Sequence, residues 1–151
     1  MSITAAQPTD LAALTRIAIA AKSHWGYPAE WMAQWHDEFV FPPAYLTDHP
    51  TFITRTGESI TGFCSLKPDT DTLHVEHLWI LPTAMGAGFG RDLFNHAESW
   101  ARAQGARQLV VESDPHATGF YERMGAVVIR QKPAPMPGAP NRALPILRKP
   151  L

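Results

Sequence analysis

The chain has 151 residues, of which 45% are hydrophobic and 18% charged, and its formal net charge is −1. This length fits one domain with a substantial core, and the composition argues against disorder. The low net charge, without a run of lysine or arginine, excludes the broad basic surface typical of proteins that bind nucleic acid or anionic membranes. The N-terminus has neither a signal-peptide pattern nor about 20 consecutive apolar residues, so we expect a cytoplasmic protein.

The first half of the chain predicts a strand, two helices and a β-hairpin. These elements are expected at residues 2–6, 10–23, 28–39, 51–54 and 59–66, with one further helical turn before residue 50. Pro28 suits the first position of the second helix, and the prolines at 42 and 43 end it. The hairpin follows from two short apolar runs that flank a polar turn containing Gly57.

The second half predicts a central strand, a helix and a set of shorter elements. They are expected at residues 73–81, 88–104, 108–112, 115–124, 127–129 and 142–147, with a proline-rich loop between the last two. Because Pro145 cannot donate a main-chain hydrogen bond, we expect the last strand at an edge of the sheet. The order β, α, α, β, β, β, α, β, α, β, β indicates a mixed α/β fold with one β-α-β crossover.

The turn between the central strand and the following helix has the features of an anion site. Gly86, Gly88 and Gly90 alternate there, and Arg91 follows them. The first N–H groups of a helix lack partners within the helix, and the helix dipole adds positive charge beside them. Glycines allow a phosphate to approach these amides closely. The pattern predicts a pyrophosphate site.

Two motifs resemble the signatures of the GNAT superfamily of acyl-CoA-dependent N-acyltransferases. The first is Met85-Gly86-Ala87-Gly88-Phe89-Gly90, where Met85 replaces the polar residue usual in that family. The second runs from Asp114 through Ala117, Phe120 and Tyr121 to Gly125, with Asp114 in the place of a common Asn. The segments 78–82 and 25–27 also resemble a bacterial branch of the family. The resemblance covers nearly the whole chain.

The resemblance implies one GNAT domain over residues 1–151. Its fold would be a mixed, mostly antiparallel central sheet with a splayed parallel strand pair, flanked by helices. Acetyl-CoA would be the co-substrate and would lie in the gap between the splayed strands. The residues implied to bind it are Leu78, Trp79, Ile80, Met85, Gly86, Ala87, Gly88, Phe89, Gly90, Arg91, Asp114, Ala117, Phe120 and Tyr121.

Acetyl transfer to an amine requires a base for the amine and a proton for the leaving thiolate. The family pattern implies Tyr121 as the proton donor, although a tyrosine packed beside Phe120 would also explain it. Strand alternation places His74 and Glu76 on one face and His77 on the other, unless a bulge intervenes. We expect Glu76 or His74 to be the base and His77 to be a core residue bonded to a backbone carbonyl.

The acceptor site is predicted from aromatic residues between the first two helices, which in this family overhang the acceptor. The candidates are His24, Trp25, Tyr27, Trp31 and Arg142. Trp31 and Trp35 equally fit one helix face packed on the core, and Arg142 either binds an acceptor carboxylate or is solvated at an edge. The acceptor is an amine on a small molecule or a peptide, and its identity stays open. Many family members form dimers, so a homodimer is a further expectation from the resemblance.

Three other interpretations fit parts of the sequence. The glycine turn is similar to those that bind dinucleotides or S-adenosylmethionine, but Arg91 occupies the place of the third glycine, and too little chain follows for a doubly wound sheet. His74 and Glu76 match part of the zinc-deaminase motif, but the lone Cys64 cannot supply its cysteine pair, so no metal is expected. A GNAT-like protein that binds acyl-CoA without turnover remains the alternative.

Overall fold

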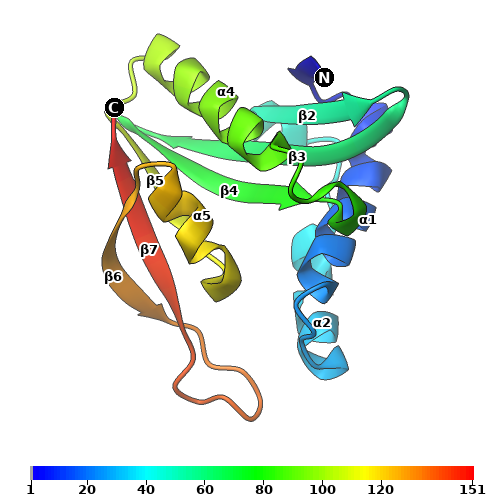
Figure 1. The fold of residues 1–151 in the computed structure, drawn as a ribbon, viewed down its shortest axis with the longest axis vertical. Helices are drawn as coiled ribbons and strands as arrows, with labels where there is room; N and C mark the ends of the chain where they lie inside the picture. Colours follow the sequence, from blue (N-terminus) through cyan, green and yellow to red (C-terminus); the bar gives the residue numbers. More distant parts are fainter. Residues whose placement is uncertain (1) are drawn as a thin grey trace.

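A computed structural model describes residues 2–151 (Figure 1). The strands are β1 Ser2–Ala5, β2 Thr51–Thr56, β3 Ser59–Asp69, β4 Thr72–Ile80, β5 Gln108–Glu112, β6 Val127–Pro133 and β7 Ala143–Pro150. The α-helices are α1 Leu11–Ser23, α2 Ala29–Trp35, α3 Tyr45–Asp48, α4 Phe89–Ala103 and α5 Thr118–Arg123. Short 3-10 segments adjoin them at η1 Pro8–Asp10, η2 His36–Phe39, η3 Pro82–Ala84 and η4 Pro115–Ala117.

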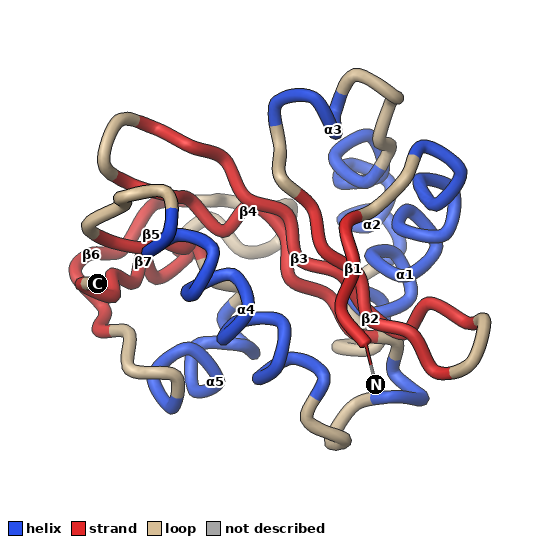
Figure 2. Tube along the Cα trace, turned by 90° about the horizontal axis from the view of Figure 1, so that it is seen from above, coloured by secondary structure: helices blue, strands red, loops and turns tan. Residues whose placement is uncertain are grey.

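The strands form one sheet in the order β1-β2-β3-β4-β5-β7-β6. Neighbouring strands are antiparallel except β4 and β5, which are parallel and joined by α4. Figure 2 shows α4 and α5 on one side of the sheet and α1, α2 and α3 on the other. The predicted mixed α/β fold with a mostly antiparallel sheet and flanking helices is confirmed.

The parallel pair separates after four residues, and this opening defines the site. Pairing between β4 and β5 runs from Thr72 opposite Gln108 to Val75 opposite Val111. Beyond Val75 the rest of β4 pairs only with β3, so its β5 side is free. The main-chain groups along that free edge can therefore bond a ligand instead of a strand.

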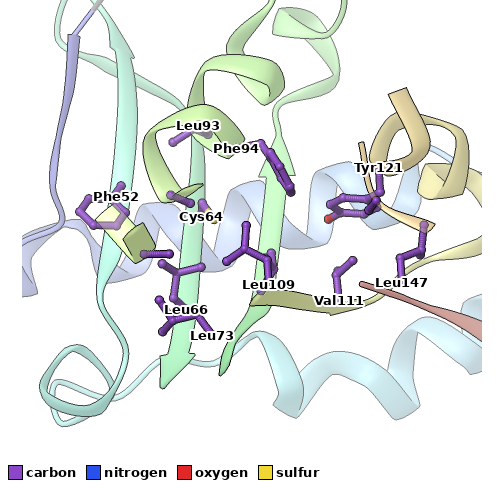
Figure 3. Packing of buried hydrophobic residues seen from close by; sticks show 14 residues of the cluster. Phe52, Cys64, Leu66, Leu73, Leu93, Phe94, Leu109, Val111, Tyr121 and Leu147 are labelled. Carbon is purple, nitrogen blue, oxygen red and sulfur yellow. The ribbon is translucent and has the colours of Figure 1, made fainter. Parts of the chain in front are cut away.

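Buried side chains form one cluster on each side of the sheet, because residues alternate across a strand. Phe63 packs with the α1 side, while its neighbour Cys64 packs with the α4 side. Leu93, Phe94 and Ala97 supply the buried stripe of α4, as the helical spacing predicts. Figure 3 shows Leu93 and Phe94 on this helix. Cys64 is fully buried, which confirms its predicted place in the core.

The strand edges differ from the prediction in one respect. β7 is not an edge strand, because it lies between β5 and β6, and β6 forms that edge of the sheet. Pro145 is tolerated because it sits one position beyond the last β5 partner, Ile146 opposite Glu112. No β5 ladder bond is therefore lost for want of its N–H, and its carbonyl accepts from Ser113 N at 2.9 Å.

Candidate active site

A cavity of about 650 Å³ lies where α4 begins, on the α4 and α5 side of the opening. The loop before the helix turns through Gly86 (φ +82°) and Gly88 (φ +90°), which are left-handed conformations that favour glycine. The first bond of the helix runs from Asp92 N to Gly88 O at 3.0 Å. The N–H groups that precede Asp92 in the helix therefore have no partner in the helix ladder, as an anion site requires.

The three glycines of the turn have different structural roles. A Cβ at Gly86 would meet no atom within 4 Å, so its space is open to a ligand. A Cβ at Gly90 would lie 3.3 Å from the ring of Phe120, so this glycine allows α4 to approach α5 closely. The side chain of Arg91 folds back across the turn, 3.1 Å from where a Cβ of Gly88 would be. Arg91 and Arg123 give this cavity positive charge.

Tyr121 lines the same cavity from α5 and is only 5% exposed. Its ring packs near Phe120 and Phe94, at 5.1 and 6.1 Å between centroids. Among the described residues none hydrogen-bonds its hydroxyl, and that oxygen is not sealed off from the cavity. Burial raises the pKa of Tyr121 far above its ordinary value, so the phenol keeps its proton at neutral pH.

A second cavity of about 480 Å³ lies on the other side of the opening, toward α1 and α2. Its lining includes Lys22, Trp35, Glu38, His74, Glu76, His77, Trp79, Asp114, Arg142 and residues 134–136. Trp79 and Asp114 also line the first cavity. The two cavities therefore meet at these two residues, where β4 has left β5.

A β-bulge changes the predicted faces of β4. Ser65 lies opposite His77 but Leu66 lies opposite Val75, so Glu76 is an extra residue without a partner. The bulge returns His77 to the face that carries His74, and the prediction that His77 points to the opposite face is wrong. Glu76 is exposed, and His74 and Glu76 both line the second cavity, as expected for candidate bases.

His77 is partly buried among aromatic rings, which include Phe39, Phe41 and Phe63. Its Nδ1 accepts from Trp79 Nε1 at 2.9 Å, so the expected bond to a backbone carbonyl is wrong. Burial lowers the pKa of His77 to about 4, with His49 adding to the shift, which keeps the ring neutral. A neutral His77 holds the indole of Trp79 in place where the two cavities meet.

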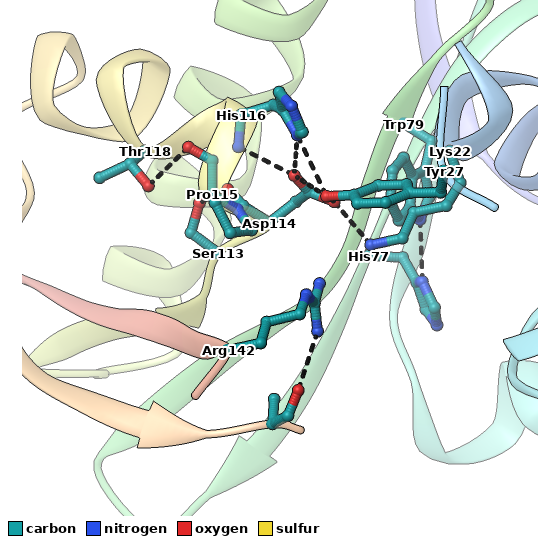
Figure 4. Close-up of polar contacts among 11 residues, drawn as sticks. Lys22, Tyr27, His77, Trp79, Ser113, Asp114, Pro115, His116, Thr118 and Arg142 are labelled. Atoms are coloured by element: carbon teal, nitrogen blue, oxygen red, sulfur yellow. Dashed lines mark hydrogen bonds and ion pairs between the residues drawn. The ribbon is translucent and has the colours of Figure 1, made fainter. Parts of the chain in front are cut away.

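Asp114 is the centre of a polar network that spans the opening (Figure 4). Its carboxylate pairs with Lys22 at 2.6 Å, accepts from Tyr27 Oη at 2.9 Å and caps η4 through His116 N at 2.9 Å. Burial raises the pKa of Asp114, but the hydrogen bond and charge of Lys22 outweigh this and lower it overall. With its oxygens used in this way, Asp114 borders the first cavity as part of a bridge between α1 and η4 rather than as a free group.

Lys22 was not predicted to belong to the site. It lies 92 residues from Asp114 in the sequence, and its side chain is 10% exposed. Burial lowers the pKa of Lys22, and its bond to Asp114 opposes that shift. The signal in the sequence is position: Lys22 comes four residues after Ala18, on the buried face of α1. A lysine on such a face rarely lacks a partner.

None of the aromatic residues predicted between α1 and α2 lines the second cavity, and Tyr27 and Trp31 line neither cavity. Trp25 lines the first cavity and stacks on His116 at 4.8 Å, so it borders the predicted co-substrate side rather than the acceptor side. Tyr27 joins the Asp114 network, and Trp31 Nε1 donates to Pro137 O at 2.8 Å, which ties α2 to the proline-rich loop. His24 lines neither cavity and packs edge-on against Trp25.

Within residues 2–151 no cluster of three or more histidine, cysteine, aspartate or glutamate side chains is arranged to hold a metal ion. Within the same residues no helix is both long and apolar enough to span a bilayer.

The sequence pattern of the acetyltransferase (GNAT) family matches residues 12–126, which include the glycine turn, β4, β5 and α5. The chain belongs to this family. Acetyl-CoA is the acyl donor of the family, and the first cavity fits it: unpaired amides, an open glycine turn and two arginines face one space. The resemblance drawn from the two motifs is thus confirmed, as is the acetyltransferase class at the level of the family.

Two individual proteins to which the chain is similar are also named as acetyltransferases. A blasticidin-S acetyltransferase of Streptomyces morookaense is 39% identical over 74 residues, which are 48% of this chain and 54% of that protein. The alignment thus spans about half the length of that curated relative. A GCN5-related N-acetyltransferase from Rhodopseudomonas palustris has a TM-score of 0.82 at 24% identity, over 99% of this chain and 95% of its own.

A structure that holds coenzyme A is also similar in fold. The PaiA N-acetyltransferase from Thermoplasma acidophilum, in complex with coenzyme A, has a TM-score of 0.79 at 19% identity over the whole of both chains. At 19% identity this similarity shows a shared fold alone.

Proposed function

We propose that this GNAT protein is an acetyl-CoA-dependent N-acetyltransferase that moves an acetyl group to a primary amine by direct transfer in a ternary complex. The observation that carries the proposal is the meeting of two cavities at the point where β4 leaves β5. One cavity has the helix N-terminus and arginines suited to coenzyme A, and the other has candidate bases. A donor and an acceptor bound on the two sides would meet at Trp79 and Asp114.

On the donor side, the N–H groups at the start of α4 and the Arg91 guanidinium would hold the pyrophosphate. The free edge of β4 at Leu78, Trp79 and Ile80 would bond the pantetheine arm, because β5 does not use those main-chain groups. Ala117 and Phe120 line the same cavity beside Tyr121 and would enclose that arm. Met85 and Phe89 also border it, where the main chain rather than a polar side chain would make the contacts.

On the acceptor side, Glu76 would take a proton from the ammonium group, directly or through water, and His74 would be the alternative base. Glu76 suits this role because the bulge exposes it at the cavity, whereas His74 Nε2 lies 3.6 Å from Asp69 Oδ2. The amine nitrogen would then bond the thioester carbon as the carbon–sulfur bond breaks, and the nitrogen would release its second proton to solvent. Tyr121 would give its hydroxyl proton to the leaving sulfur and regain one from solvent.

The surroundings of Tyr121 fit its proposed role as the acid. A phenol is protonated at neutral pH, and the hydroxyl of Tyr121 has no bond to the described residues that would have to break before it gives its proton. Cys64 offers no competing nucleophile, because burial raises the pKa of its thiol to about 12. The geometry therefore favours direct transfer over an acetyl-cysteine route.

We place the whole chain in one catalytic domain that acts in the cytoplasm on a small-molecule or peptide amine, without nucleic acid or membrane partners. The blasticidin-S acetyltransferase among its relatives favours a small-molecule acceptor. A homodimer is proposed from the family alone, and sedimentation of the purified protein tests it.

Release of coenzyme A thiol from acetyl-CoA, measured over a panel of amines, tests the activity. Turnover of at least one amine, with an N-acetyl product by mass spectrometry, is the expected result. Glu76→Gln should lower kcat on that amine more than His74→Gln does. If coenzyme A protects the protein from unfolding but no amine releases thiol, the chain is instead a non-catalytic acyl-CoA-binding protein.

A further inference from the structure

Arg142 is a cation of the acceptor cavity that no described acidic side chain neutralises. The other two lining cations are paired, Lys22 with Asp114 and Lys132 with Glu112, each at 2.6 Å. No carboxylate of the described residues lies within 4 Å of Arg142; its Nη1 donates to Ala134 O at 3.3 Å, and the guanidinium also acts on the Tyr27 hydroxyl, whose pKa it lowers against the larger effect of burial. A guanidinium has five N–H donors, so most of those of Arg142 are free.

Aromatic rings hold the Arg142 guanidinium in place. Its Cζ lies 5.2, 5.6 and 5.8 Å from the ring centroids of Trp35, Trp31 and Tyr27. Contacts of this kind fix a guanidinium without using its N–H groups. The group is half-buried, and its neighbour Lys22 is also positive. This end of the cavity therefore presents ordered donors and excess positive charge.

A negative charge, that of Glu76, lies elsewhere in the same cavity. Glu76 makes no ion pair with a described residue and is the proposed base on β4, while Arg142 directly precedes β7. Glu38 also lines the cavity but does not come within 4 Å of the guanidinium. The cavity thus offers a site for an ammonium group at one place and a site for an anion at another.

We infer that the acceptor carries an anionic group as well as its amine, and that Arg142 binds this group and so selects the acceptor. A carboxylate and a phosphate share the chemistry required, two oxygens that take parallel hydrogen bonds from a guanidinium. The inference rests on the proposed acetyltransferase function, because it names the class of amine that this activity uses.

Matched pairs of acceptors test the inference. One arm compares amino acids with their carboxamides, and the other compares aminoalkyl phosphates with the corresponding aminoalcohols, with kcat and KM taken from thiol release. The wild-type enzyme should prefer one anionic series by about 10-fold or more, because hydrogen bonds to charged groups are worth about that factor. The arm that shows the preference identifies carboxylate or phosphate.

Variants assign the preference to Arg142. Arg142→Gln should raise KM for the preferred anionic acceptors by about 10-fold to 100-fold, leave kcat nearly unchanged and leave the neutral partners within about 3-fold. Arg142→Lys should recover part of the loss, since it restores charge without the planar fork. Arg148→Gln is the control, because Arg148 lies further along β7, bonds Gln108 and lines neither cavity.

Equal use of anionic and neutral acceptors by the wild type would overturn the inference, as would equal losses on both series in Arg142→Gln. If no amine is acetylated, the proposed function has failed separately. Calorimetry then decides the anion site by itself: the same anionic compounds should bind the wild type in the presence of coenzyme A and should lose binding in Arg142→Gln. Unchanged binding in that variant would refute the site.

Discussion

The ion pair between Lys22 and Asp114 can be tested by the substitution Asp114→Asn, which removes the charge and puts an amide NH2 group in the place of the Oδ2 that pairs with Lys22. The asparagine oxygen can still accept from His116 N, so the cap of η4 is kept. What remains is the Lys22 ammonium, 10% exposed and without its carboxylate. The variant therefore isolates the cost of leaving one charge of a buried pair alone.

Breaking a buried pair by removing one partner costs about 3–5 kcal/mol. We expect the lower end, about 3 kcal/mol, because burial already lowers the pKa of Lys22 and loss of its proton limits the cost. For a domain of this size such a loss corresponds to a fall of about 6–12 °C in Tm. The pair Lys132–Glu112 is equally short at 2.6 Å but about half exposed, so Lys132→Gln should cost less than about 1 kcal/mol.

Denaturant unfolding of four proteins measures these costs: wild type, Asp114→Asn, Lys132→Gln and the double variant Lys22→Met with Asp114→Asn. Methionine keeps the apolar stem that packs on Trp35, 4.2 Å below Lys22 Nζ. The double variant should therefore regain most of the lost stability. The reasoning is refuted if Asp114→Asn is as stable as Lys132→Gln, or if the double variant is no more stable than Asp114→Asn.

Acid should remove the same interaction in the wild type. The net pKa of Asp114 lies below its unfolded value of about 3.9, so its stabilisation is fully present above that pH. It is lost as the pH falls through the lower, folded pKa. The wild type should therefore lose more stability below about pH 4 than Asp114→Asn does.

Further predictions concern the acid, the glycine turn and His77. Tyr121→Phe should lower kcat by about 100-fold with unchanged coenzyme A affinity and stability, because the hydroxyl has no partner among the described residues; a wild-type rate would show that the acid is another group. Gly88→Ala should weaken coenzyme A binding, measured by calorimetry, and should lower the free energy of unfolding by about 1–2 kcal/mol. Gly57→Ala is the control: Gly57 has a φ of +61° in the β2–β3 turn, so its substitution should lower stability by a similar amount without changing coenzyme A binding. His77 has a folded pKa of about 4, so between about pH 6.5 and pH 4 the unfolded chain binds a proton that the folded one does not. Stability should fall by about 3 kcal/mol as the pH drops through that window, and His77→Gln should flatten the fall; parallel curves would contradict the burial argument.

The fold was predictable where local signals agreed. Helix α4 follows from apolar residues at helical spacing, with Gly88 before it and Gly105 after it. Strand β5 was found at its observed bounds because it is short, apolar and bounded by polar residues. The place of β7 was not predictable, because a proline signals an edge only if the strand that faces its nitrogen reaches it, and β5 ends one position short of Pro145.

The site was predictable as far as main-chain chemistry and motif order reach. The glycine turn and Tyr121 border one cavity, and Glu76 and His74 border the other. The bulge at Glu76 arises from the register between β3 and β4. No residue type in β4 indicates this register, so strand alternation alone gives the wrong face for His77. The pair of Lys22 with Asp114 joins residues far apart in the chain, so only the burial of a lysine pointed to it.

The walls of the two cavities draw partly on different stretches of the chain. The donor side is built between residues 78 and 124, apart from Ala21 and Trp25. The acceptor side draws on α2, η2 and the stretch from Lys132 to Leu144, and that stretch lies beyond residue 126, where the family pattern stops. Substitutions in the proline-rich loop can therefore change which amine is accepted without changing the residues that line the coenzyme A cavity. New acceptor specificities can arise in this way from one wall of the second cavity.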